Sequence, residues 1–144
     1  TVLKQKGCTD YYCRPASRPF ADKIIDLTGL AEARGITDAD GHFRLGALTT
    51  WSELAGASLP PQFDALAEAA RHVGGVQIQN AGSIGGNLCN ASPAADSIPT
   101  LIALGAICNI AGPNGTRTVP VEQFCVAPGK NCLGLGEFLV SLSI

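Results

Sequence analysis

The fold is decided by one stretch, residues 76 to 99, which reads VQIQNAGSIGGNLCNASPAADSIP. Between residues 82 and 93, only Ile84 and Leu88 carry large aliphatic side chains. The glycines at positions 85 and 86 allow the main chain to approach an anion closely, as phosphate-binding loops require. We therefore expect a strand-like start at Val76, a loop around the paired glycines, and a cofactor lying against the bare amides of that loop.

Neutral hydrogen-bonding side chains follow one another closely in this stretch, at Ser83, Asn87, Asn90 and Ser92. Such groups suit the hydroxyls and oxygens of a nucleotide. Paired glycines also mark tight turns and bulges in proteins that bind no ligand there. Composition alone therefore leaves a purely structural turn as the alternative.

The whole ordered string, with Ser83-Ile84-Gly85-Gly86-Asn87 followed by Ala91-Ser92-Pro93 and Asp96, carries a resemblance. It resembles the FAD-binding subunit or domain of the molybdenum hydroxylases, the xanthine dehydrogenase and carbon monoxide dehydrogenase family. The resemblance implies an α+β fold, the two-lobed FAD-binding domain of the PCMH type, which is vanillyl-alcohol-oxidase-like. It also implies that residues 1–32 are a remnant of a truncated small N-terminal lobe and that residues 33–144 form the larger lobe.

The same resemblance implies a set of FAD contacts and no catalytic acid, base or nucleophile. Lys6-Gly7-Cys8-Thr9-Asp10 resembles the first pyrophosphate loop of the family, with Lys6 in place of a small residue and Cys8 in place of the second glycine. Phe138 or Leu139 resembles the apolar residue that faces the isoalloxazine. The implied cofactor-binding residues are Gly7, Cys8, Thr9, Asp10, Ser83, Ile84, Gly85, Gly86, Asn87, Asn90, Asp96 and Leu139.

The implied function is that of a flavoprotein component of an oxidoreductase. Electrons would arrive from iron-sulfur clusters and leave to an acceptor such as NAD, a quinone or oxygen. The implied partners are a molybdopterin-bearing large subunit and a 2Fe-2S small subunit, or equivalent domains. The alternative is a non-catalytic domain that keeps the fold and has lost FAD, as the altered loop at Lys6 and Cys8 would allow.

Length and charge narrow the class of protein. A chain of 144 residues with a formal net charge of -2 and no cluster of Lys and Arg predicts one domain that does not bind nucleic acid. No apolar run reaches the length of a membrane span, and no signal-peptide pattern begins the sequence. We therefore expect a cytoplasmic location. The absence of methionine and the strand-like first residues suggest a piece of a longer protein.

Six cysteines raise the question of metals and disulfides. No C-x-x-C motif occurs and neither histidine lies at ligand spacing from a cysteine pair, so zinc and iron-sulfur sites are disfavoured. Cys108 lies in an apolar run, where a free thiol behaves as a small buried hydrophobe. A small secreted domain held by disulfides stays open as a second alternative.

Periodicity and turn residues predict the remaining elements. Asp-Gly at positions 40–41 predicts a hairpin turn, Thr50 with Glu53 predicts a capping box, and Gly74-Gly75 predicts a helix end. His42 and His72 are expected to be structural. The expected strands are residues 1–5, 23–27, 36–37, 42–48, 105–111, 116–119 and 137–144, and the expected helices begin at residues 50 and 60 and cover residues 96–104 and 120–124.

Overall fold

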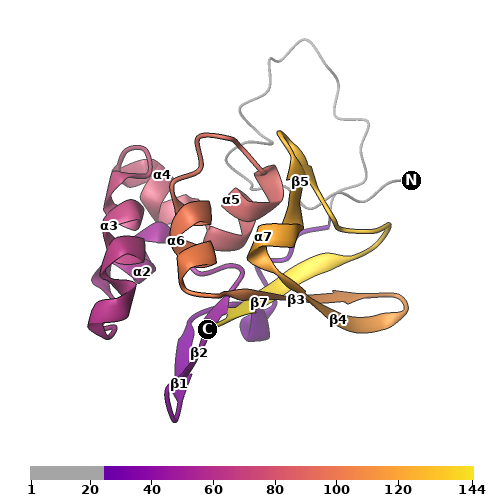
Figure 1. Cartoon of the computed structure of the whole chain (residues 1–144), viewed down its shortest axis with the longest axis horizontal. Helices are drawn as coiled ribbons and strands as arrows, with labels where there is room; N and C mark the ends of the chain where they lie inside the picture. Colours follow the sequence, from indigo (N-terminus) through magenta and orange to yellow (C-terminus); the bar gives the residue numbers. More distant parts are fainter. Residues whose placement is uncertain (1–24) are drawn as a thin grey trace.

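A five-stranded sheet is the centre of the computed structural model, which describes residues 25–144. The strand order is β1-β2-β7-β3-β4, and every pairing within the sheet is antiparallel. In Figure 1 the helices α2 to α6 gather on one side of this sheet. The arrangement confirms the α+β prediction. The strands are β1 (Ile36–Ala39), β2 (His42–Gly46), β3 (Ile107–Gly112), β4 (Gly115–Pro120) and β7 (Phe138–Ser143).

The helices are short: one precedes β1, most follow one another between β2 and β3, and one comes after β4. A separate two-stranded sheet, β5 (Cys125–Ala127) with β6 (Lys130–Asn131), precedes β7. The helices are η1 (Ala31–Ala33), α2 (Trp51–Gly56), η2 (Pro61–Phe63), α3 (Asp64–His72), α4 (Val76–Ala81), α5 (Ile84–Asn90), α6 (Ser97–Ala103) and α7 (Val121–Phe124). Within residues 25–144 none of these helices has the length and apolar character needed to cross a membrane.

Two short-range motifs that the sequence predicts, a hairpin turn and a helix cap, form in the structure. The β1–β2 turn places Asp40 at φ 55° and Gly41 at φ 83°, as an Asp-Gly hairpin turn requires. The Thr50 side chain accepts a hydrogen bond from Glu53 N, and the Glu53 side chain accepts one from Thr50 N, which completes the capping box of α2. Both predictions are confirmed.

The core lies between the sheet and the helices. Phe43 of β2 meets Phe63 edge to face, with 4.8 Å between ring centroids. Leu66 and Ala70 place one apolar face of α3 in the core, as its periodicity predicts. The fully buried large side chains are Trp51, Phe63, Phe124, Leu45, Leu54, Leu66, Ile84, Leu88, Leu101, Ile110, Leu139 and Leu142.

Three predictions of local structure are wrong. Val76–Ala81, predicted as strand-like, is helix α4, and the predicted glycine loop is mostly helix α5. Residues 25–27, the described part of a predicted strand, have no regular structure. Short helices with two glycines are poor helix formers in isolation, so tertiary packing rather than local propensity holds α5. The expected strand at residues 1–5 lies outside the described residues.

Candidate cofactor-binding site

Helix α5 presents one narrow polar stripe on an otherwise buried surface. From Ser83 to Asn90, the only residues that are not buried are Ser83, Asn87 and Asn90. Their spacing of i, i+4 and i+7 places them on one face of the helix. We call these three residues the α5 stripe. It carries hydroxyl and amide groups and no formal charge.

The beginning of α5 is fixed to the segment that follows β2. Ile84 N donates to Thr49 O at 3.0 Å, and Ser83 forms a β-bridge with Thr50. The Ser83 side-chain oxygen accepts from Gly86 N at 3.2 Å, which caps the helix. The stripe therefore begins at a point that the main chain of the segment between β2 and α2 holds in place.

The paired glycines serve the protein's own packing. Gly85 N donates to Ala47 O at 2.9 Å, and a Cβ added to Gly85 would lie 2.6 Å from both Ala47 Cβ and Ala47 O. Gly86 N is occupied by the Ser83 cap. The prediction that bare amides of Gly85 and Gly86 face a ligand is therefore wrong. Glycine is needed at position 85 because the helix lies directly against the strand that precedes it.

Asn87 is the best-placed hydrogen-bond donor of the stripe. Ser97, which is fully buried, donates through its hydroxyl to Asn87 Oδ1 at 2.7 Å. This bond fixes the amide plane and leaves the Asn87 Nδ2 group without a hydrogen-bond partner among residues 25–144. The Asn90 side chain also lacks a partner within that range. Two half-buried amides are thus available to an external oxygen atom.

Sequence reasoning did not find Ser97. It lies ten positions after Asn87, beyond the irregular residues 91–96, and no local pattern marks that contact. Its hydroxyl acts on the site by orienting Asn87.

The end of α5 is held by the small sheet and by the loop that follows it. Cys125 Sγ contacts Leu88 O at 3.6 Å, and Asn131 Nδ2 donates to Cys89 O at 2.8 Å. Leu88 O already accepts from Ala91 N at 3.0 Å, whereas Asn131 supplies the partner of Cys89 O, a carbonyl that the end of the helix leaves unpaired. Both ends of the stripe are therefore anchored to parts of the chain distant in sequence.

An apolar hollow of about 310 Å³ adjoins the end of the stripe. Asp96, predicted to bind FAD, is exposed just before α6, and no hydrogen bond to its side chain is found in the described part of the chain. The hollow is lined by Ala91, Ser92, Pro93, Ala95, Ile98, Pro99, Cys125, Val126, Ala127 and Pro128.

Other predicted contacts lie elsewhere. Ile84 is fully buried and Leu139 is 1% exposed, so both pack in the core, while Phe138 beside Leu139 is partly exposed. Their contact with a cofactor stays a prediction. Gly7, Cys8, Thr9 and Asp10 lie outside the described residues.

The thiols near α5 are structural. Burial raises the pKa of the Cys89 thiol far above its usual range and raises the pKa of Cys108 to about 12, with the nearby cysteines adding to both shifts. Cys89, Cys108, Cys125 and Cys132 are all free of disulfides. No group of ligands able to hold a metal ion is found among residues 25–144.

Residues 7–144 match a family model described as the FAD binding domain in molybdopterin dehydrogenase. The chain belongs to this family. An FAD-binding-domain relative, the xanthine dehydrogenase FAD-binding subunit of Escherichia coli O157:H7, is 41% identical over 120 residues, which cover 82% of this chain and 41% of that protein. The carbon monoxide dehydrogenase medium chain of Hydrogenophaga pseudoflava is 31% identical over 124 residues, 85% of this chain and 43% of that protein.

Solved structures of the same family agree with the fold. Reconstituted CO dehydrogenase from Oligotropha carboxidovorans gives a TM-score of 0.75 at 28% identity, covering 79% of this chain and 40% of that one. Quinoline 2-oxidoreductase from Pseudomonas putida 86 gives a TM-score of 0.73 at 28% identity, covering 83% of this chain and 42% of that one. The predicted family and fold class are confirmed. The chain spans about two fifths of each of these four relatives, from 40% to 43% of their lengths.

Proposed function

We propose that this FAD-binding domain holds FAD along the α5 stripe and serves as the flavoprotein component of a molybdenum-containing hydroxylase or dehydrogenase. The observation that carries the proposal is the Asn87 amide. Its oxygen is bound by the buried Ser97 hydroxyl at 2.7 Å, so its nitrogen is held as a donor without a protein partner in the described region. No buried side-chain nitrogen or oxygen atom lacks a partner among residues 25–144, so the Asn87 nitrogen is open to water, and a ligand oxygen can take the place of that water.

The donor set fits the polar part of a flavin nucleotide. Asn87 and Asn90 would donate to diphosphate oxygens or accept from ribityl hydroxyls, and Ser83 would add its hydroxyl hydrogen. Asp96, an acceptor when ionised, would take a hydroxyl hydrogen, and residues 7–10 would complete the site. FAD supplies the redox chemistry when bound. The protein's contribution is to orient it on a helix fixed at both ends.

The relay of electrons is a further part of the proposal. We infer that the domain assembles with a 2Fe-2S small subunit and a molybdopterin-bearing large subunit, or with equivalent domains. Reducing equivalents would arrive at the flavin from the 2Fe-2S clusters. They would leave to NAD or another acceptor. Relatives named as medium chains and as FAD-binding subunits support such an assembly. The division into lobes at residues 32 and 33, and a cytoplasmic location, belong to the same proposal.

Titration of the chain with FAD, followed by flavin fluorescence, tests the site. Asn87→Ala should weaken binding about 10- to 100-fold, because a hydrogen bond to a charged group contributes about 1.5–3 kcal/mol. Asn114→Ala, in the exposed β3–β4 turn, removes the same group far from the stripe and should leave binding unchanged.

Asn87→Asp separates a binding role from a structural one. A carboxylate can still accept the Ser97 hydrogen bond, but it offers no donor and repels a diphosphate. We expect binding weaker than in Asn87→Ala. If Asn87→Asp bound FAD with wild-type affinity, the proposed contact would be contradicted. If the wild-type chain were colourless and took up no FAD, the alternative of a domain that keeps the fold without its cofactor would be supported.

A further inference from the structure

Strand β1 is an edge of the main sheet, and no strand among residues 25–144 pairs with its outer side. Its register with β2 pairs Ile36 with Leu45 and Asp38 with Phe43, and Gly46 N donates to Gly35 O at 2.8 Å. In an antiparallel ladder such bonds alternate, so the backbone N–H and C=O groups of Ile36 and Asp38 point away from β2. No hydrogen bond to these four groups is found in the part of the chain that the structure describes. Two donors and two acceptors therefore line this edge without a partner among the described residues.

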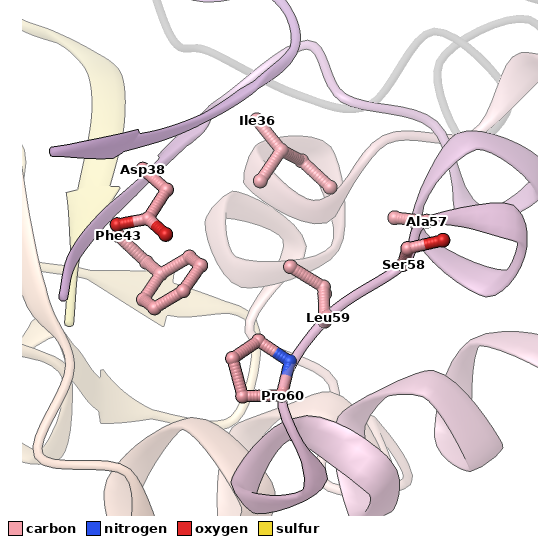
Figure 2. Close-up of a pocket in the computed structure, with 7 residues that line it drawn as sticks. All are labelled: Ile36, Asp38, Phe43, Ala57, Ser58, Leu59 and Pro60. Atoms are coloured by element: carbon pink, nitrogen blue, oxygen red, sulfur yellow. The ribbon is translucent and has the colours of Figure 1, made fainter. Parts of the chain in front are cut away.

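A hollow lies beside this edge, between the sheet and the helical layer. Figure 2 shows Ile36 and Asp38 of β1 and Phe43 of β2 on one side of it, facing Leu59 and Pro60. Its volume is about 520 Å³. That is roughly three times the ~150 Å³ cavity that holds a benzene ring. Ala57 and Ser58 complete the lining.

Among the side chains that line the hollow, only the Ser58 hydroxyl and the Asp38 carboxylate are polar. Asp38 Oδ1 accepts from Gly41 N at 3.0 Å, which leaves its second oxygen available. Ile36, Phe43 and Leu59 offer hydrocarbon on either side of the space. A ligand that fits would combine one apolar group with one positive charge, placed about two residues apart along an extended backbone.

We propose that the β1 edge binds an extended segment of a partner polypeptide, which adds a strand to the sheet. Its backbone pairs with Ile36 and Asp38, an apolar side chain enters the hollow, and a Lys or Arg two residues away meets the Asp38 carboxylate. Addition of a strand to an open edge, with alternate side chains in an adjoining pocket, is a general mode of peptide recognition.

A second copy of this chain fits the same edge poorly. Antiparallel pairing of two β1 strands would place Asp38 either opposite the other Asp38 or opposite Ile36. The first arrangement brings like charges together, and the second buries a carboxylate against hydrocarbon. A register that sets Asp38 opposite Arg34 falls outside the strand, because β1 begins at Ile36 and Gly35 has φ 76°. The chemistry of the edge therefore favours a different, basic segment.

The hollow is separate from the proposed FAD site. None of its lining residues belongs to the α5 stripe. In Figure 1 the β1–β2 hairpin extends from the end of the sheet away from α5. FAD uptake by the variants below should therefore equal that of the wild type, so a failure of this proposal is distinguishable from a failure of the proposed function.

Selection from a displayed library of random 12-residue peptides, with the whole 144-residue chain as bait, tests the proposal. Recovered peptides should carry an apolar residue and a Lys or Arg at alternate positions. When they are synthesised, hydrogen exchange should show protection of the Ile36 and Asp38 amides on binding. Recovery of no peptide above background, or of peptides lacking this pattern, would overturn the proposal.

Two matched variants locate the contact. Asp38→Asn and Asp40→Asn remove the same charge from the same hairpin, and only Asp38 lines the hollow. Fluorescence anisotropy should show about threefold weaker peptide binding for Asp38→Asn and no change for Asp40→Asn. Ser58→Trp, at an exposed position, should fill the hollow and abolish binding. Equal binding by wild type, Asp38→Asn and Ser58→Trp would refute the assignment, as would a dimer in sedimentation that is lost in Ser58→Trp.

Discussion

Replacing Gly85 by alanine separates the two reasons for a glycine at this position, protein packing and cofactor approach. The new Cβ would lie 2.6 Å from Ala47 Cβ and Ala47 O and 2.9 Å from Ala47 Cα. Two of these atoms are backbone, so neither can rotate away. Either α5 must move from the segment after β2, or that segment must move from α5.

The expected cost follows from three effects. Overpacking of a core contact costs about 1–3 kcal/mol. Stretching the 2.9 Å bond from Gly85 N to Ala47 O removes a contribution of about 1 kcal/mol. Alanine in a helix recovers about 1 kcal/mol relative to glycine. The net loss is roughly 2 kcal/mol, which for a chain of this size lowers the melting temperature by about 6 °C.

Thermal unfolding followed by circular dichroism, in the absence of FAD, measures this loss. Gly56→Ala is the matched control, because Gly56 is also helical and a Cβ there would meet nothing within 4 Å. The control should be neutral or slightly stabilised. If Gly85→Ala were as stable as Gly56→Ala and yet took up no FAD, position 85 would serve the cofactor, and the packing argument would be refuted.

Three other perturbations have outcomes that the structure specifies. Thr50→Ala should lower the free energy of unfolding by about 1 kcal/mol in urea titration, because it removes the cap of α2; an unchanged midpoint would contradict the capping box. Hydrogen bonds from Arg117 and from Gly134 N lower the pKa of the Glu137 carboxyl to about 2. The contribution of this carboxylate to stability is therefore present above pH 4.5 and is lost as the pH falls towards 2. The melting temperature of Glu137→Gln should therefore fall less between pH 5 and pH 2 than that of the wild type, and parallel curves would contradict the ion pair. Iodoacetamide at pH 8, with mass spectrometry of the native protein, should modify half-buried Cys125 well before Cys108, whose pKa is about 12; equal rates would show that the core opens.

Elements with local chemistry could be predicted from the sequence. The Asp40-Gly41 turn requires positive φ at both residues, and few other pairs adopt it readily. The reciprocal hydrogen bonds of Thr50 and Glu53 need only a spacing of three residues. In both cases the interacting groups lie within four residues, so the sequence contains the whole interaction.

Helix α5 could not be predicted in this way, because its partners lie far away in the sequence. The first amide of α5, Ile84 N, donates to Thr49 O, and the second, Gly85 N, donates to Ala47 O. At the other end of the helix, Asn131 Nδ2 donates to Cys89 O. Local propensity at Gly85 and Gly86 favours a loop, and contacts between residues 35 to 42 positions apart override it. The sequence therefore indicated the segment but not the use of its atoms, since the amides of Gly85 and Gly86 are bonded within the protein and the side chains of the α5 stripe are the partly exposed groups.

The anchoring of α5 has a consequence for how the proposed site recognises its ligand. Ser83 is fixed by its β-bridge to Thr50, and Asn87 by the Ser97 hydroxyl, before any ligand arrives. Groups held in advance lose little conformational entropy on binding. Ser97→Ala should therefore weaken FAD binding through loss of Asn87 orientation although Ser97, being fully buried, does not touch the ligand. The loss should be smaller than in Asn87→Ala, because the freed amide can still donate after rotating into place. A loss equal to or greater than that of Asn87→Ala would mean that Ser97 holds the connection between α5 and α6 rather than one side chain.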